Sequence, residues 1–231
     1  MRILRFLIGL LLLPCCVAVG RTIYFILAAT DNYREAVGAS FWVALGAGLF
    51  LWILVFVFLP APVKTYVLAH ELTHALWGSL MGATVLGMRV SKKGGSVKLS
   101  ESNLLVVLAP YFFPLYTMLI VGAWFLASVF MDLQKYFPLF VGAMGFTLGF
   151  HVSFTVSAMG QRQPDLEQYG RFFSFALICF MNLLVVGLLL VLVLPVSASQ
   201  FMVRLATDFK EVWNLIWRGI LGLACLLISR F

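Results

Sequence analysis

The sequence predicts an all-α fold: a polytopic transmembrane helical bundle of about six spans, with one small β-hairpin and a C-terminal amphipathic helix. Hydrophobic residues make up 63% of the 231 residues and charged residues 11%, whereas soluble proteins average about 45–50% and about 25%. Several apolar runs reach the roughly 20 residues that a helix needs to cross a bilayer. No polar stretch is long enough for a soluble domain, so we predict a single membrane domain over 1–231.

The net charge of the chain indicates which partners to expect. The net charge of +7 is spread over short loops, which suits anionic lipid headgroups. We therefore expect the lipid bilayer, and no nucleic acid, as a partner.

The four cysteines lack the spacing of a disulfide framework or of a metal site, so they are interpreted as small packing residues; they are Cys15, Cys16, Cys179 and Cys225.

The N-terminal spans are predicted within residues 1–62. Arg2 and Arg5 precede an apolar run that resembles a signal peptide. We interpret it as a retained first span reaching about residue 29, either continuous or broken near Pro14. The second span is expected over residues 40–59, because proline residues follow at once.

A core of spans is expected within residues 63–196. The first starts near Val63, and the small residues Gly78 and Gly82 are expected to let a neighbouring helix come close. A kinked span with Pro110 and Pro114 should follow over residues 104–131. Further spans are predicted over 137–159 and 172–194, and the first of these carries small residues that favour close helix packing.

Residues 84–100 show the alternation of a β-hairpin. Apolar and polar residues alternate on both sides of Lys92-Lys93-Gly94-Gly95, which predicts two strands joined by a glycine-containing turn. The edge at Val97, Lys98 and Leu99 could bind an extended substrate peptide by strand addition. The alternative is a basic connector at the headgroups, because an isolated hairpin is only marginally stable.

The segment 197–231 is predicted to be amphipathic. Its polar residues recur at helical spacing opposite apolar ones, which is typical of a helix lying in the membrane interface. Residues 219–228 are expected either to return into the bilayer or to pack on the bundle.

The most informative stretch lies at the start of the core. His70 and His74 are four residues apart, so a helix presents both imidazoles to one point, with Glu71 beside them. Such a motif arises by chance in about one of seven hundred chains of this composition. Two imidazoles and a third protein ligand are a typical catalytic zinc site, in which the glutamate activates a water molecule. The alternative is a pair of polar residues packed between helices.

The third ligand must come from another segment. Asp165 follows Pro164 at the start of a span, where a helix N-terminus favours an anion, and it is the preferred ligand. His151 is the alternative; with Asp165 as ligand, His151 could stabilise an oxyanion or orient the substrate. Each also has a structural interpretation, Asp165 as a helix cap and His151 as a polar contact between helices.

These residues resemble a known family. The site-2 protease type of intramembrane zinc metalloprotease (M50), above all its small bacterial branch without a PDZ domain, is similar to this chain in four places: His70-Glu71-Leu72-Thr73-His74-Ala75-Leu76, Gly94-Gly95, Asn103-Leu104-Leu105 and Ala109-Pro110-Tyr111. The resemblance covers residues 63–182. It implies one Zn²⁺ held by His70 and His74, Glu71 as general base, a transmembrane protein as substrate and a place in the bacterial plasma membrane.

The chain departs from the family at the aspartate. Relatives carry it in an Asn-Pro-containing Leu-Asp-Gly motif on the third core span, and here Gln163-Pro164-Asp165 is only a partial match.

Two alternatives to the intramembrane protease stay open. One is a membrane protein whose metal site serves structure, transport or regulation without proteolysis, and the other is a membrane zinc protease of the prenyl-peptide-processing kind.

Overall fold

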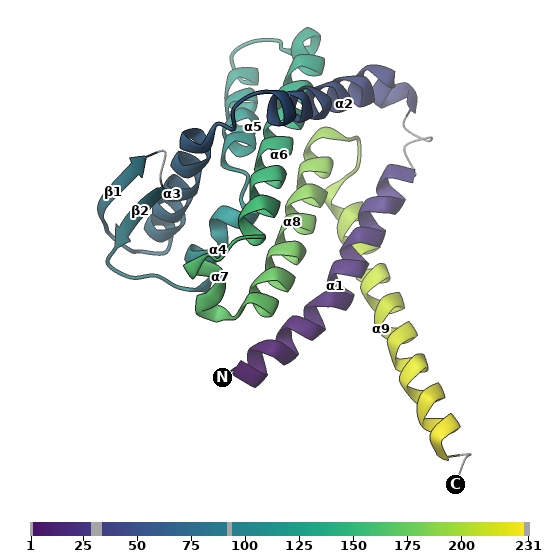
Figure 1. Cartoon of the computed structure of the whole chain (residues 1–231). Coiled ribbons are helices and arrows are strands. Elements are labelled where there is room, and N and C mark those ends of the chain that lie inside the picture. Colours follow the sequence, from purple (N-terminus) through teal and green to yellow (C-terminus); the bar gives the residue numbers. More distant parts are fainter. Residues whose placement is uncertain (1, 29–33, 92–93, 229–231) are drawn as a thin grey trace. The chain divides into compact units, whose positions relative to one another are not determined.

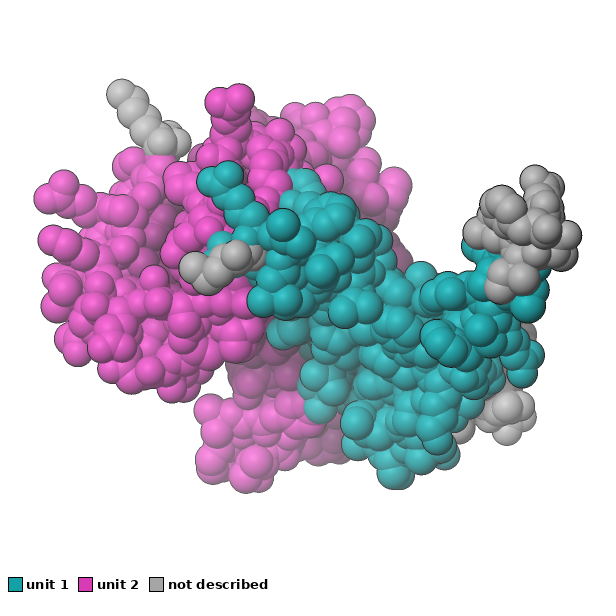
Figure 2. All heavy atoms as spheres, turned by 90° about the horizontal axis from the view of Figure 1, so that it is seen from below, with its two compact units in different colours: residues 1–37, 172–231 teal, residues 38–171 magenta. Residues whose placement is uncertain are grey.

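The computed structural model describes residues 2–28, 34–91 and 94–228, which are mostly helical (Figure 1). The chain divides into two compact units, residues 1–37 with 172–231 and residues 38–171 (Figure 2). The first unit contains α1 (Arg2–Ala28), α8 (Arg171–Val193) and α9 (Ala198–Ile228). The second contains α2 (Arg34–Phe58), α3 (Val63–Leu80), β1 (Val85–Ser91), β2 (Gly94–Leu99), α4 (Leu104–Phe112), α5 (Leu115–Ser128), η2 (Gln134–Tyr136), α6 (Phe137–Met159) and α7 (Pro164–Tyr169). The prediction of one domain over 1–231 stays a prediction.

Several helices have the length and apolar character that a membrane protein requires. Among the described residues, four could cross a bilayer, namely Arg2–Ala28, Ala39–Phe58, Gln134–Met159 and Arg171–Val193. A fifth is added if the bent pair α4 and α5 forms one span. The predicted number of about six is not confirmed, because α3 is not among them. Helix α3 has only 18 residues, and they include Lys64, His70, Glu71 and His74.

Two proline predictions have different outcomes. The expected kink in the fourth span is present, since α4 and α5 are bent by 78°. The break falls at Phe113 and Pro114, whereas Pro110 lies inside α4. Helix α1 runs unbroken through Pro14, so the broken alternative for the first segment is wrong.

The predicted hairpin is confirmed. Strands β1 and β2 pair antiparallel, with Met88 opposite Val97 and Ser91 opposite Gly94. Gly94 and Gly95 belong to β2, and Gly94 has φ of +140°, which favours glycine. The other two residues of the predicted turn, 92 and 93, lie outside the described residues. The hairpin packs against α3 (Figure 1).

The glycines of α3 and α6 allow close packing with different partners. A Cβ at Gly78 would lie 2.7 Å from Leu99 Cδ1, so the close neighbour there is β2 and the expected helix neighbour is wrong. Gly82 lies beyond α3 with φ of +89°. On α6, a Cβ at Gly145 would lie 2.6 Å from the carbonyl oxygen of Leu45. Helix α2 therefore approaches α6 closely, as predicted for the fifth span.

Helix α4 forms the centre of the second unit. All its residues from Val106 to Phe112 are buried, and it packs against α3, α6 and α7. Its start is capped by Asn103, whose side-chain oxygen accepts hydrogen bonds from the N–H groups of Leu105 and Val106. A fixed, buried α4 holds α3 and α7 at defined positions.

Helix α9 is one continuous helix through Gly219. Its residues 217–226 are exposed. Both expectations for residues 219–228, a return into the bilayer or packing on the bundle, stay predictions. Farther back, Phe201, Asp208 and Val212 are buried. Helix α9 packs against α1, and Phe201 lies close to Gly187 of α8.

Candidate metal centre

Helix α3 brings the two histidines of the motif together. His70 Nε2 and His74 Nε2 lie 3.2 Å apart, and the two side chains are 13% and 11% exposed. This arrangement follows from the four-residue spacing, which places both rings on one face of the helix. Thr73 is buried and donates its hydroxyl proton to the carbonyl of Ala69 within the same helix.

Asp165 completes a group of three possible ligands. Its Oδ2 lies 3.3 Å from His70 Nε2 and 3.6 Å from His74 Nε2. One ligand atom from each of the three residues lies within 4.8 Å of the others, so the group could hold a metal ion. The short helix α7 starts at Pro164 after an extended Gln163, and the fully buried Leu166 anchors it. The structure thus brings the preferred third ligand to the histidines.

Hydrogen bonds orient each member of this group. His74 donates its Nδ1 proton to the carbonyl of Val106 at 2.8 Å, which orients the ring so that Nε2 faces Asp165. His70 Nδ1 lies 3.5 Å from the Tyr66 hydroxyl oxygen. Tyr111 donates its hydroxyl proton to Asp165 Oδ2 at 3.1 Å. Outer hydrogen bonds of this kind fix the tautomer and direction of metal ligands.

The environment keeps Asp165 ionised. Burial by itself would raise the pKa of its carboxyl group, but hydrogen bonds from His70 and His74, together with their charge, hold this pKa well below its usual range. An anionic oxygen beside two imidazole nitrogens is a donor set that suits zinc and other divalent transition metals.

Glu71 is buried beside the group and has a close neighbour in β2. The side chain is 6% exposed. A Cβ at Gly95 would lie 2.7 Å from Glu71 Cγ and 2.8 Å from Glu71 Oε1. Any larger residue at position 95 would therefore displace the glutamate or the strand.

A cleft of about 610 Å³ gives access to these groups. It is lined by the two histidines, Glu71 and Asp165, and also by the predicted strand edge of Val97, Lys98 and Leu99. The size is typical of a ligand pocket. The metal ligands, the general base and the strand edge predicted from the sequence therefore border one cavity.

His151 occupies a different place. It is 9% exposed on α6 and lines a small hollow of about 20 Å³ with His70 and Thr73. The ligand group found among the described residues does not include it. Its role in orienting substrate stays a prediction.

Three residues of the site were not assigned from the sequence: Tyr111, Val106 and Gly95. Tyr111 belongs to the Ala109-Pro110-Tyr111 run and Gly95 to the glycine pair, so both were within recognised motifs without a role. The contact of His74 with Val106 uses a backbone carbonyl, so the pattern of side chains in the sequence does not predict it. Family models, curated proteins and solved structures gave no match to this chain.

Proposed function

We propose that this chain is an intramembrane zinc metalloprotease that hydrolyses peptide bonds in or near transmembrane segments of membrane proteins. The main support is the convergence of His70 Nε2, His74 Nε2 and Asp165 Oδ2, with Glu71 beside them in one cleft. Two imidazoles, one carboxylate and a separate glutamate are the donor set of many zinc hydrolases.

Each residue has a defined task in this proposal. Zn²⁺ held by the three ligands would acidify a bound water molecule and polarise the scissile carbonyl. Glu71 accepts the proton of the water and returns it to the leaving amine. Tyr111 and the carbonyl of Val106 keep Asp165 and His74 in place.

The substrate peptide must be extended at the site, because a helix keeps its peptide groups hydrogen bonded to one another. Strand β2 pairs with β1 along one edge, and its residues Val97 to Leu99 also line the cleft. A peptide added to the other edge of β2 would satisfy its backbone groups beside Glu71.

The test compares Glu71→Gln with the matched variant Glu167→Gln. Glu167 lies on α7, is exposed and does not line the cleft. Purified full-length proteins are given model transmembrane peptides in liposomes, with products identified by mass spectrometry and metal by elemental analysis. Glu71→Gln should retain one equivalent of zinc and cleave about 10²–10⁴-fold more slowly, which is the range for loss of a general base. Glu167→Gln should cleave like the wild type.

Two results would contradict the proposal. One is equal cleavage by Glu71→Gln, because the base would then be dispensable. The other is a zinc-loaded wild type that cleaves none of the peptides, which would favour a metal site without proteolysis.

A further inference from the structure

A second cavity of about 490 Å³ lies on the other side of the motif glutamate. His70, Glu71, Gly95 and Gln163 line both this cavity and the cleft described above. The two spaces therefore meet at Glu71. A peptide bond placed at Glu71 would have one flank in each cavity.

The first cavity has a polar lining next to β2 and the segment that follows it. Lys98, Ser100, Glu101 and Ser102 line it, and Gln168 of α7 does so as well. None of these residues belongs to a candidate membrane span in the described part of the chain. This side suits the polar flank of a substrate.

The second cavity has one wall of aromatic and aliphatic side chains, and Ser157, Gln161 and Gln163 line it elsewhere. Phe56 of α2 and Phe154 of α6 line it together with Tyr66 and Val67 of α3. The rings of Tyr66 and Phe154 are stacked, with centroids 4.6 Å apart and planes at 8°, and Phe56 meets Phe154 edge to face at 5.9 Å. Both α2 and α6 are candidate membrane spans. A rigid aromatic wall of this kind favours a large apolar side chain.

The direction of the peptide follows if it pairs antiparallel to β2, as β1 does on the other edge. Gly94 lines only the apolar cavity, Gly95 lines both, and Val97 to Leu99 line only the polar one. A peptide added antiparallel to β2 therefore has its N-terminal part in the polar cavity and its C-terminal part in the apolar one. Its residues after the scissile bond lie against the aromatic wall.

We infer that the cavity walled by Phe56, Tyr66 and Phe154 is a specificity pocket for a large aromatic or aliphatic side chain on the C-terminal side of the scissile bond. This inference rests on the proposed proteolytic function and deepens it. In this inference, Phe56, Tyr66 and Phe154 determine which peptide bond is cleaved.

The experiment uses peptides that differ only at the residue after the scissile bond, which is Phe, Ala or Lys. Mass spectrometry identifies the bond cleaved, and initial rates give kcat/KM. The wild type should prefer Phe over Ala by about tenfold or more, the range that a hydrophobic pocket can supply. It should prefer Phe over Lys by about a hundredfold, because the ammonium group of Lys would lose its water against the aromatic wall.

The variant Ser157→Asp tests the pocket itself. Ser157 is exposed and lines only the apolar cavity, so the new carboxylate should lower kcat/KM for the Phe peptide by about tenfold and raise it for the Lys peptide. Ser79→Asp is the matched control, because Ser79 is exposed on α3 and lines neither cavity. Its preference should equal that of the wild type.

The outcomes separate the inference from the function on which it rests. An unchanged Phe to Lys preference in a zinc-loaded, active Ser157→Asp protein would overturn the pocket assignment and leave the protease in place. A large apolar preference on the N-terminal side of the bond would also overturn it. Absence of any Glu71-dependent cleavage by the zinc-loaded wild type would instead refute the proposed function, and the pocket with it. Loss of zinc from Ser157→Asp would reveal misfolding, in which case the wild-type peptide series decides.

Discussion

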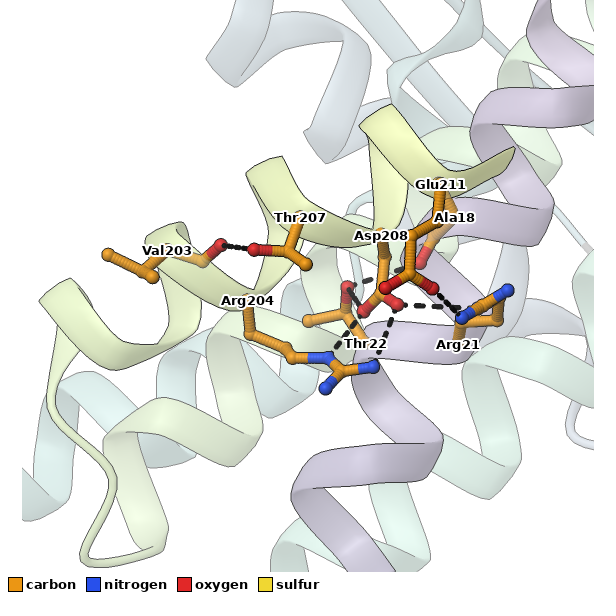
Figure 3. Close-up of polar contacts among 8 residues, drawn as sticks. All are labelled: Ala18, Arg21, Thr22, Val203, Arg204, Thr207, Asp208 and Glu211. Carbon is orange, nitrogen blue, oxygen red and sulfur yellow. Dashed lines mark hydrogen bonds and ion pairs between the residues drawn. The ribbon is translucent and has the colours of Figure 1, made fainter. Parts of the chain in front are cut away.

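Two carboxylates in this chain, the fully buried Asp208 and the half-buried Asp165, have opposite surroundings. Asp208 of α9 is fully buried in the first unit. It accepts two hydrogen bonds from Arg204, at 2.8 and 2.9 Å, one from Arg21 at 3.3 Å and one from Thr22 at 2.9 Å (Figure 3). Arginine does not lose its proton in proteins, so this carboxylate is saturated by fixed positive charge and has no place for a metal.

Asp165 in the second unit has partners of another kind. It faces two imidazole nitrogens and the hydroxyl of Tyr111, and its side chain is 27% exposed beside a cleft. Imidazoles can give up a proton and become metal ligands near neutral pH. The comparison shows that burial of a carboxylate does not by itself indicate a functional site. The chemistry of its partners separates a metal ligand from a structural ion pair.

The Asp208 cluster fastens α9 to α1. The guanidinium of Arg204 also lies over the ring of Phe25, 3.6 Å from its centroid, and Arg21 forms an ion pair with Glu211. These contacts join positions far apart in the sequence through buried or half-buried charges, so they specify how the two helices pair.

The largest expected effect is on metal binding. Asp165→Ala removes one of the three proposed ligands and should weaken zinc affinity by more than about 100-fold, since loss of outer-shell partners alone costs about 10–100-fold. Asp208→Ala should retain stoichiometric zinc. Competition with a chromophoric chelator measures both, and a zinc affinity in Asp165→Ala equal to that of the wild type would remove Asp165 from the ligand set.

A smaller loss is expected from the support of Asp165. Tyr111→Phe deletes the hydroxyl that donates to Asp165 Oδ2 and should weaken zinc binding by about 10–100-fold. The matched control is Tyr116→Phe, whose lost hydroxyl donates to the carbonyl of Thr65 instead. The same chelator titration compares the two. Equal affinities would mean that Asp165 is oriented without Tyr111.

The sequence could predict those parts of the site that depend on local periodicity. The spacing of His70 and His74 implies a shared helix face, and the alternation of apolar residues implies the hairpin. Asp165 is favoured because it follows Pro164 at the predicted start of a span, where a helix N-terminus favours an anion. Each of these inferences needs only a short window, in which backbone geometry determines which side chains face the same way.

The remaining features depend on contacts between distant segments. The partner of Asp165 is Tyr111, 54 residues away, and Thr22 lies 186 residues from Asp208. Asp208 and Arg204 fit the polar face of an amphipathic helix, but that face packs against α1. Gly78 was expected to adjoin a helix, and its neighbour is Leu99 of β2. A helical or alternating pattern indicates which residues share a face and leaves open what the face contacts.

Removing the charge of Asp208 should affect stability and leave the metal site intact. Asp208→Asn leaves Arg204 and Arg21 without their shared counter-charge and should lower the free energy of unfolding by about 2 kcal/mol, because hydrogen bonds to charged groups contribute about 1.5–3 kcal/mol. Glu211→Gln should cost less than about 1 kcal/mol, since the Glu211 side chain is 50% exposed. Denaturant unfolding in detergent, followed by circular dichroism, measures both. Equal costs would mean that burial of Asp208 contributes nothing.

The smallest expected effect is the pH dependence of the stability difference between the wild type and Asp208→Asn. Burial alone would raise the pKa of Asp208, but hydrogen bonds from Arg204 and Thr22 lower it below its usual value. The carboxyl group of Asp208 therefore takes up a proton less readily in the folded protein than in the unfolded chain, where its pKa is about 3.9. The stability that the charged carboxylate contributes is fully present only above that pH. The stability difference between wild type and Asp208→Asn should stay constant from about pH 5 to 8 and shrink as the pH falls below about 4. Because His70, His74 and Asp165 are the same in both proteins, their own titration cancels in this difference. A difference that stayed constant down to about pH 2 would show that the Asp208 cluster is not held together by the charge of the carboxylate.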